Sequence, residues 1–278
     1  VLTETPPKTK INVVTKRITA DQLTPVMLYL SVRDCFTDPV LLESNEARDN
    51  EHYYSIVGLE TLASFTVDQG EITRKQTGRW AATERVDNAE TVSLRLREFL
   101  EDFHLKYTDE DPVVRQFNGL IGHTNFEGVQ YFDTLKFDNP KVLRGPDLRY
   151  HLYRFVLVFH HYRDELILIE NLVEGEASRM AEVEAAIKRG GGVHPFSREG
   201  KESSNLTDEA YKEMVAAGKH HCRVGDVFQI VLSRQFKQGF RGDEFQVYRA
   251  LRSINPSPYL FYFDYGDYRI MGSSPESQ

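Results

Sequence analysis

The stretch FVLVFHHYRDELILI, residues 155–169, holds two apolar runs of valine, isoleucine, leucine and phenylalanine separated by a polar centre. Each run is shorter than a typical helix and rich in the β-branched and aromatic residues that favour strands. The polar residues from His160 to Asp164 between the two runs provide a turn. We therefore predict a buried β-hairpin formed by 155–159 and 166–169.

Similar short runs precede the hairpin and predict strands at 25–32, 40–42, 53–59 and 63–67. Between 88 and 103 the period changes, because Val92, Leu96 and Phe99 recur every three or four residues. That spacing is typical of an amphipathic helix with one apolar face. The N-terminal part of the chain is therefore expected to combine a sheet with a flanking helix.

Beyond the hairpin the same criteria predict helices at 176–188, 207–221 (with Thr207 as N-cap) and 243–254, a strand at 227–232, and a hairpin of 259–263 and 268–271. The three glycines 190–192 open a polar segment, 190–206, that we expect to be a flexible linker between regions 1–189 and 207–278. Antiparallel hairpins with interspersed helices indicate the α+β class, and no regular strand–helix alternation is present.

Composition excludes several functional classes. The 278 residues include 42 acidic and 34 basic side chains, which gives a formal charge of -8 and argues against nucleic-acid binding. No apolar run approaches the roughly 20 residues needed to cross a bilayer, and the N-terminal residues do not resemble a secretory signal. Two cysteines, Cys35 and Cys222, do not form a disulfide framework. We expect a cytoplasmic protein.

No self-contained catalytic motif is apparent. Adjacent side chains on a strand or helix diverge, so neither His160 with His161 nor His220 with His221 is expected to share a metal. The sequence has no glycine-rich phosphate loop and no nucleophile elbow. From the residues alone, the prediction stops at an α+β protein without a complete catalytic site.

Three segments carry a more specific signal. They are GDVFQIVLSR at 225–234, YRALRSINPSPYL at 248–260 and MGSSPE at 271–276, and LLES at 41–44 lies far upstream. In this order and spacing they resemble the large subunit (component I) of anthranilate synthase, within the wider family of chorismate-utilising enzymes. The resemblance runs over essentially the whole chain and is weaker from about 60 to 200. The chain departs from the family pattern at Gly122-His123 and Phe126-Glu127.

The resemblance implies a fold of large antiparallel β-sheets with flanking helices, an incomplete two-sheet sandwich. Region 1–189 would serve regulation and partner docking, and 207–278 would begin the chorismate-binding domain. Active-site lining is implied for Gln229, Ser273, Ser274 and Glu276. Because Val1 and Gln278 do not look like natural termini, we expect a fragment that is inactive alone, with the glutamate ligands of a catalytic Mg²⁺ beyond residue 278.

LLES resembles the family's tryptophan-binding motif, and an effector site is therefore implied. Its expected residues are Glu43, Ser44, Tyr54, Pro258, Tyr259 and Leu260. Glu43 and Ser44 would meet the ammonium and other polar groups of the amino acid, and 258–260 would supply backbone groups and an apolar wall. The alternative is that Glu43 and Ser44 are an ordinary solvated strand end.

Gln229 bears on the reaction. Relatives that add water to chorismate have Lys at this place, where it acts as general base, and an amide cannot take a proton at working pH. The expected activity is therefore anthranilate synthase: chorismate with ammonia or glutamine gives anthranilate and pyruvate, the first step of tryptophan biosynthesis. Tryptophan would inhibit it, and a glutamine amidotransferase subunit would supply the ammonia. The alternatives are aminodeoxychorismate synthase component I and a non-catalytic module that binds tryptophan or a partner.

Overall fold

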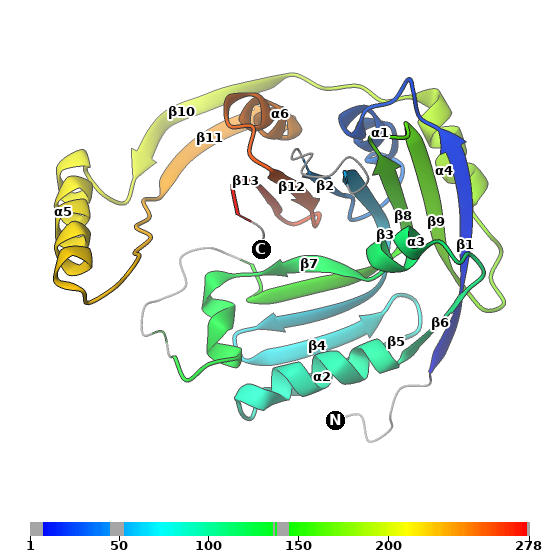
Figure 1. Ribbon diagram of the computed structural model, residues 1–278, viewed down its shortest axis with the longest axis horizontal. Helices are drawn as coiled ribbons and strands as arrows, with labels where there is room; N and C mark the ends of the chain where they lie inside the picture. The colour runs from blue at the N-terminus through cyan, green and yellow to red at the C-terminus, as the bar shows by residue number, and fades with distance from the viewer. Residues whose placement is uncertain (1–7, 45–52, 136, 138–144, 277–278) are drawn as a thin grey trace. The chain divides into compact units, whose positions relative to one another are not determined.

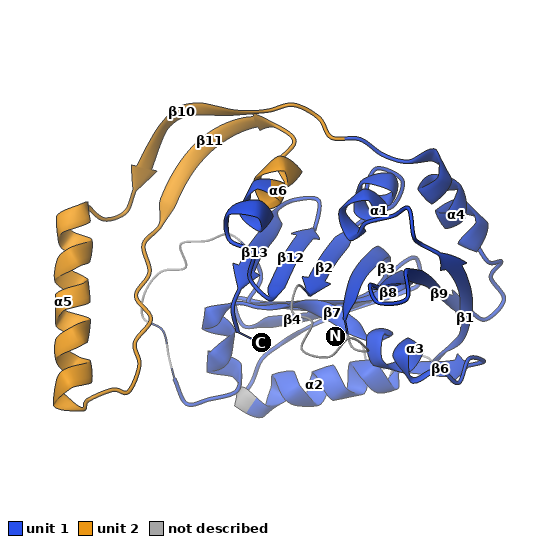
Figure 2. Cartoon of the chain, turned by 45° about the horizontal axis from the view of Figure 1, so that its top comes forward, with its two compact units in different colours: residues 1–192, 250–278 blue, residues 193–249 orange. Residues whose placement is uncertain are grey.

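The computed structural model describes residues 8–44, 53–135, 137 and 145–276. The chain divides into two compact units, here called unit 1 (1–192 with 250–278) and unit 2 (193–249), which Figure 2 colours separately. This division differs from the three predicted regions, because the last residues of the chain return to unit 1. Among the described residues no helix is both long and apolar enough to span a bilayer.

Unit 1 is organised around an eleven-stranded sheet with the order β13-β12-β2-β3-β8-β9-β1-β6 (Figure 1). Off this path, β4 pairs with β3, β5 with β4, and β7 with β8. All pairings are antiparallel except that of β1 with β6. The strands are β1 (Thr9–Thr19), β2 (Val40–Ser44), β3 (Tyr54–Asp68), β4 (Glu71–Gln76), β5 (Trp80–Arg85), β6 (Phe103–Tyr107), β7 (Leu120–Thr124), β8 (Leu148–His160), β9 (Glu165–Val173), β12 (Tyr259–Asp264) and β13 (Arg269–Ser274).

The predicted central hairpin is confirmed by β8 and β9. Their register runs from Phe155 opposite Glu170 to His160 opposite Glu165, and Asp164 in the turn has a positive φ of 46°. The apolar side chains of both strands are buried. The β8–β9 pair lies inside the sheet, between β3 and β1, and its faces are covered. Strands in such a position are apolar along their whole length, which explains the continuous apolar sequence.

Helices cover the sheet and connect its strands. They are α1 (Pro25–Val32), α2 (Ala89–Glu101), α3 (Pro112–Phe117), the 3₁₀ helix η2 (Phe126–Tyr131), α4 (Met180–Arg189) and α6 (Phe245–Ile254). The predicted helix at 88–103 is confirmed as α2, where Asn88 forms a capping box with Thr91. Val92 and Phe99 of α2 are buried in a cluster with Phe65 and Ile72 of the sheet.

Two strand predictions in the N-terminal part need correction. Residues 25–32 form helix α1 instead of a strand, because Thr24 accepts a hydrogen bond from the Met27 N–H and Pro25 occupies the first helical turn. The eight-residue apolar run hid this start signal. The expected strands 53–59 and 63–67 are one strand, β3, which is interrupted by an irregularity between Thr61 and Ala63.

Unit 2 contains helix α5 (Asp208–Val224), a two-stranded sheet and the first half of α6. Strand β10 (Phe196–Ser204) pairs with β11 (Phe236–Gly242), and α5 lies between them in sequence. Thr207 caps α5 as predicted, and Gly225 ends it in the left-handed conformation with φ 85°. The predicted linker 190–206 thus contains a strand.

The strand predicted at 227–232 is wrong, because residues 227–235 are neither helix nor strand. Phe228 in this segment is fully exposed. A β-branched run forms a strand only where a neighbouring strand accepts its backbone hydrogen bonds. No such neighbour pairs with this segment within the described ranges.

The hairpin predicted at 259–263 and 268–271 is confirmed by β12 and β13, with Tyr259 opposite Ser274 and Asp264 opposite Arg269. Strand β12 also pairs with β2, so a hairpin near the end of the chain extends the N-terminal sheet. The α+β class and the large antiparallel sheet with flanking helices are confirmed. The strand β2 that carries Glu43 and Ser44 therefore lies between β3 and β12.

Gly122 of β7 provides a test of this packing. A Cβ added at Gly122 would lie 2.0 Å from the Arg149 carbonyl oxygen and 2.6 Å from the Tyr150 Cα, both backbone atoms of β8. We expect Gly122→Ala to lower the free energy of unfolding by about 2–3 kcal/mol, because an overpacked backbone contact cannot relax by side-chain rotation.

The control is Gly119→Ala, three residues earlier, where an added Cβ meets no atom within 4 Å. Its expected effect is within about 0.5 kcal/mol. Urea unfolding followed by circular dichroism measures both variants. Equal stability of the two variants would show that β7 does not pack on β8 as described.

Candidate functional site

The structure joins two of the segments that resembled the family. Strands β2 and β12 are neighbours in the sheet (Figure 1). In their pairing Ser44 lies opposite Tyr259, and Glu43 lies opposite Leu260. Pro258 directly precedes β12. Tyr54 begins β3, the other neighbour of β2, where Ser55 lies opposite Glu43. The residues predicted for the effector site are therefore neighbours in space.

The pleat of β2 separates its two polar side chains. Directly opposed residues share a face of a sheet, and successive residues alternate between faces. Glu43 shares its face with Leu260 and Ser55, whereas Ser44 shares the opposite face with Tyr259. Glu43 and Ser44 therefore cannot contact one amino acid from the same face of the sheet. One ligand can contact both only around the end of β2, where Ser44 is the last residue.

Glu43 is not a solvated strand end. Its side chain is 1% exposed, and its two carboxylate oxygens lie 3.0 and 3.2 Å from Nε of Arg252. Arg252 belongs to α6, and its own side chain is 40% exposed. A buried carboxylate needs such a cation, because removing it from water without a partner is unfavourable. The chain thus supplies its own cation to this carboxylate.

Three further side chains complete what we call the Glu43 cluster: Tyr53, Ser55 and His161 in addition to Glu43 and Arg252. The Ser55 hydroxyl lies 2.8 Å from Nε2 of His161, and the Tyr53 ring stacks on that imidazole with centroids 4.0 Å apart. Burial, and then the charge of Glu43, raises the pKa of Tyr53. Burial, followed by His160 and Arg252, lowers the pKa of His161 to about 4.

The charge state of the Glu43 cluster follows from these shifts. At neutral pH the imidazole and the phenol are uncharged, so the carboxylate of Glu43 and the guanidinium of Arg252 are the charged groups of the cluster. An ammonium group that approached Glu43 would compete with Arg252 for this carboxylate. Arg252, Ser55 and His161 were missed by the sequence analysis, although Arg252 lies within the quoted segment 248–260.

The residues predicted to line an active site fall into two places. Ser273 and Ser274 lie on β13, opposite Leu260 and Tyr259, and so continue the two rows that start at Glu43 and Ser44. The Ser273 hydroxyl donates to the carbonyl of Asn255 at 2.6 Å. The Ser274 hydroxyl accepts from the N–H of Glu276 at 3.2 Å. These hydroxyls hold the local chain in shape.

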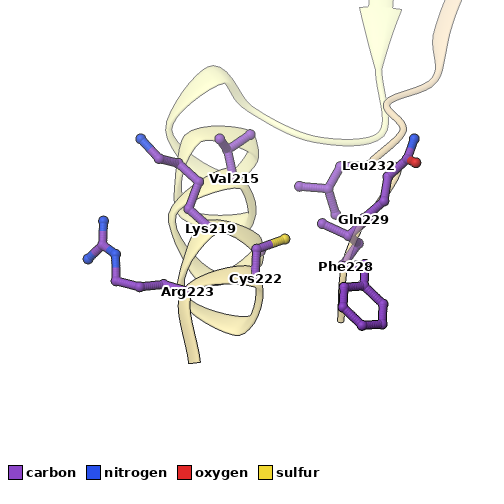
Figure 3. Close-up of a pocket in the computed structure, with 9 residues that line it drawn as sticks. Val215, Lys219, Cys222, Arg223, Phe228, Gln229 and Leu232 are labelled. Carbon is purple, nitrogen blue, oxygen red and sulfur yellow. The ribbon is translucent and has the colours of Figure 1, made fainter. Parts of the chain in front are cut away.

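Gln229 lies in unit 2, whereas Ser273, Ser274 and Glu276 lie in unit 1. It is exposed and lines a cavity of about 590 Å³ between α5 and the segment 228–232. Gly218 of α5 permits this approach, because a Cβ there would lie 3.3 Å from side-chain atoms of Ile230 and Leu232. Figure 3 shows Cys222 directed toward that segment.

The described residues do not provide a metal site. No group of three or more His, Cys, Asp or Glu side chains in these ranges is arranged to hold an ion. A bound Mg²⁺ would need ligands from other residues.

The pKa of His161 generates a prediction about stability. Because its pKa is about 4 in the folded protein and about 6.5 in an unfolded chain, the unfolded state binds the extra proton between these values. Stability should therefore fall as the pH decreases from 6.5 to 4. We expect a loss of about 1–2 kcal/mol, less than the full linkage value because the ring is partly accessible to solvent.

Replacing this ring by a non-titrating amide, His161→Gln, should remove that part of the pH dependence. The control is His104→Gln, on the exposed side of β6. Urea unfolding at pH 4, 5, 6 and 7 measures the difference. Parallel pH profiles for wild type and His161→Gln would show that the imidazole is not held in the neutral form.

Comparison with known proteins places this arrangement in a family. Anthranilate synthase component 1 of Thermus thermophilus is 32% identical over 270 residues, which cover 94% of this chain and 55% of that protein. The corresponding protein of Lactococcus lactis is 28% identical over 272 residues and is covered to 57%. The chain thus spans about half the length of the curated relatives it matches.

Solved structures show the same fold. The crystal structure of anthranilate synthase component I from Streptococcus pneumoniae aligns with a TM-score of 0.57 at 22% identity, over 94% of this chain and 57% of that one. MenF, the menaquinone-specific isochorismate synthase of Escherichia coli, aligns with a TM-score of 0.51 at 13% identity, over 99% of this chain and 53% of that one. Residues 38–277 match the family described as chorismate binding enzyme, and the chain belongs to that family.

Proposed function

We propose that this chain is part of an anthranilate synthase component I. The observation that carries the proposal is the β2–β12 register, which places Glu43 and Ser44 beside Leu260 and Tyr259 in a member of the chorismate binding enzyme family. The names of the relatives that match along nearly the whole chain support the same activity. The protein would act on chorismate in the cytoplasm.

The proposed reaction joins chorismate and ammonia and releases anthranilate, pyruvate and water. Ammonia is itself the nucleophile, so no general base is needed to activate water, and an amide such as Gln229 suits that chemistry. A glutamine amidotransferase subunit would deliver the ammonia. A magnesium ion, held by residues other than those described, would neutralise negative charge on the substrate. The 278 residues alone would not turn over chorismate.

Tryptophan is the proposed inhibitor, and the Glu43 cluster suggests how it would bind. Its ammonium would take the place of Arg252 at the Glu43 carboxylate, around the end of β2. Ser44, Pro258 and Tyr259 would contact the rest of the ligand, with Tyr54 behind them. Because Arg252 is carried by α6, its release would change the contact between α6 and β2, a local two-state event of the kind that couples sites.

Product analysis tests the proposed activity. The intact protein that contains this chain is incubated with chorismate, ammonium and Mg²⁺, and the products are separated by liquid chromatography. We expect anthranilate and pyruvate in equal amounts. Aminodeoxychorismate without pyruvate would assign the protein to the sister activity, and unreacted chorismate would refute both.

Calorimetric titration of L-tryptophan into the 278-residue chain tests the effector site. We expect saturable binding that L-phenylalanine does not reproduce. Ser44→Phe should abolish it, because the larger side chain fills the space beside Tyr259. Glu43→Gln should also abolish it by removing the partner of the ammonium. Circular dichroism confirms that each variant is folded.

Arg252→Gln should have the opposite effect and strengthen the binding of tryptophan. Without the competing guanidinium the Glu43 carboxylate is open to the ammonium, so tryptophan should bind about threefold to tenfold more tightly, which corresponds to about 0.7–1.4 kcal/mol. Weaker binding by folded Arg252→Gln would rule out displacement of Arg252. Unchanged binding in Ser44→Phe would place tryptophan elsewhere.

A further inference from the structure

A second polar site lies in unit 1, away from the Glu43 cluster. It is a cavity of about 410 Å³ beside the irregular part of β3. The β3–β8 register shifts between Thr61 and Ala63, and Glu60 has a positive φ of 60°. Bulges and left-handed non-glycine residues carry a conformational cost and concentrate at functional sites. Its charged and imidazole side chains are Asp38, Glu60, Lys75, Arg149, His151, Arg154 and Glu176.

One wall of this cavity is a row of side chains across three strands. Ser64 of β3 lies opposite Lys75 of β4 on one side and opposite His151 of β8 on the other. Arg149, two residues before His151, points to the same face. This face of the sheet therefore carries a hydroxyl, an ammonium, an imidazole and a guanidinium side by side. Strands hold such side chains more precisely than loops do.

The hydrogen bonds of His151 fix its proton. Arg149 Nε donates to His151 Nε2 at 3.3 Å, and a guanidinium can only donate, so Nε2 accepts and Nδ1 carries the hydrogen. Nδ1 then donates to the Thr61 hydroxyl at 2.8 Å, which donates to Asp38 at 2.7 Å. Burial, followed by Arg149 and His123, lowers the pKa of His151 to about 3, so the ring adds no charge.

Two of the three acidic groups of the cavity, Glu60 and Glu176, are paired with arginines. Glu60 accepts from Arg179 at 2.7 and 2.9 Å, and Glu176 accepts from Arg154 at 2.8 Å. Asp38 ends the chain of hydrogen bonds from His151. Two basic groups of the cavity, Lys75 and Arg149, lack ion pairs of comparable strength within the described part of the chain.

Lys75 makes no hydrogen bond or ion pair with any side chain in the described ranges. Arg149 has an ionic contact with Asp267 at 3.4 Å, but Asp267 is 71% exposed, so that contact is weak. The guanidinium also lies over the ring of Tyr265, 4.4 Å from its centroid. Two cations thus remain available to an anion that enters the cavity.

We propose that this cavity binds a small organic carboxylate, with Lys75 and Arg149 contacting the carboxylate and Ser64 lying between them. The planar guanidinium matches a carboxylate in two parallel hydrogen bonds, and the ammonium adds a mobile charge. The cavity volume lies at the lower end of the range that is usual for ligand sites, and it suits a metabolite of about ten heavy atoms. All lining residues belong to unit 1, so this site does not depend on the proposed function.

The probe is L-malate, titrated by calorimetry into the 278-residue chain at low ionic strength, where screening is weak. We expect saturable binding that weakens at least tenfold in Lys75→Met and in Arg149→Gln. The matched control is Lys106→Met, an exposed lysine on β6 outside the cavity, which should change the affinity less than twofold. Circular dichroism and the thermal midpoint confirm that each variant is folded.

Two further ligands make the outcome decisive. The dimethyl ester of L-malate has the same skeleton without charge and should not bind, and inorganic phosphate should bind more weakly than malate. Absence of malate binding to the folded wild type would overturn the proposal, as would equal weakening in Lys75→Met and Lys106→Met. Tighter binding of phosphate, or equal binding of the ester, would refute the assignment to carboxylates.

Discussion

The antiparallel ladder between β3 and β8 is the contact on which the rest of unit 1 depends. It runs from Tyr54 opposite His160 to Val67 opposite Leu148. The other edge of β3 is shared by two strands, since its first half pairs with β2 and its second half with β4. The two halves meet at Glu60 to Leu62, where the register shifts. One irregularity therefore lets the sheet branch and also opens the cavity beside Lys75 and Arg149.

The Glu43–Arg252 pair links this sheet to the later part of the chain. A buried carboxylate fixes the place of a guanidinium more strongly than it stabilises the fold, because desolvation offsets much of the Coulomb attraction. The proposed effector site uses this balance, because a ligand ammonium would replace the Arg252 guanidinium as the cation beside Glu43. An apolar contact at the same place could not respond to the charge of an amino acid.

Much of the fold could be predicted from the sequence because its signals are local. The period of α2, the apolar runs of β8 and β9, and the turn residues at 264–267 depend only on neighbouring residues. The two incorrect predictions have different causes. Helix α1 was not predicted because its apolar run suits a strand equally well, although Thr24 and Pro25 provide a helix start signal. The segment 227–232 has strand composition but lacks a neighbouring strand among the described residues.

The sequence by itself determined the class, the family resemblance and the segments that carry polar groups of interest, because these follow from composition and ordered motifs. Only the tertiary structure decided that Glu43 is buried against Arg252, that Ser44 leaves β2 on the other face, and that Lys75, Ser64 and His151 form one row. Strand order and register decide which side chains become neighbours. They result from the packing of strands far apart in sequence, and a shift of one residue would move every side chain to the opposite face.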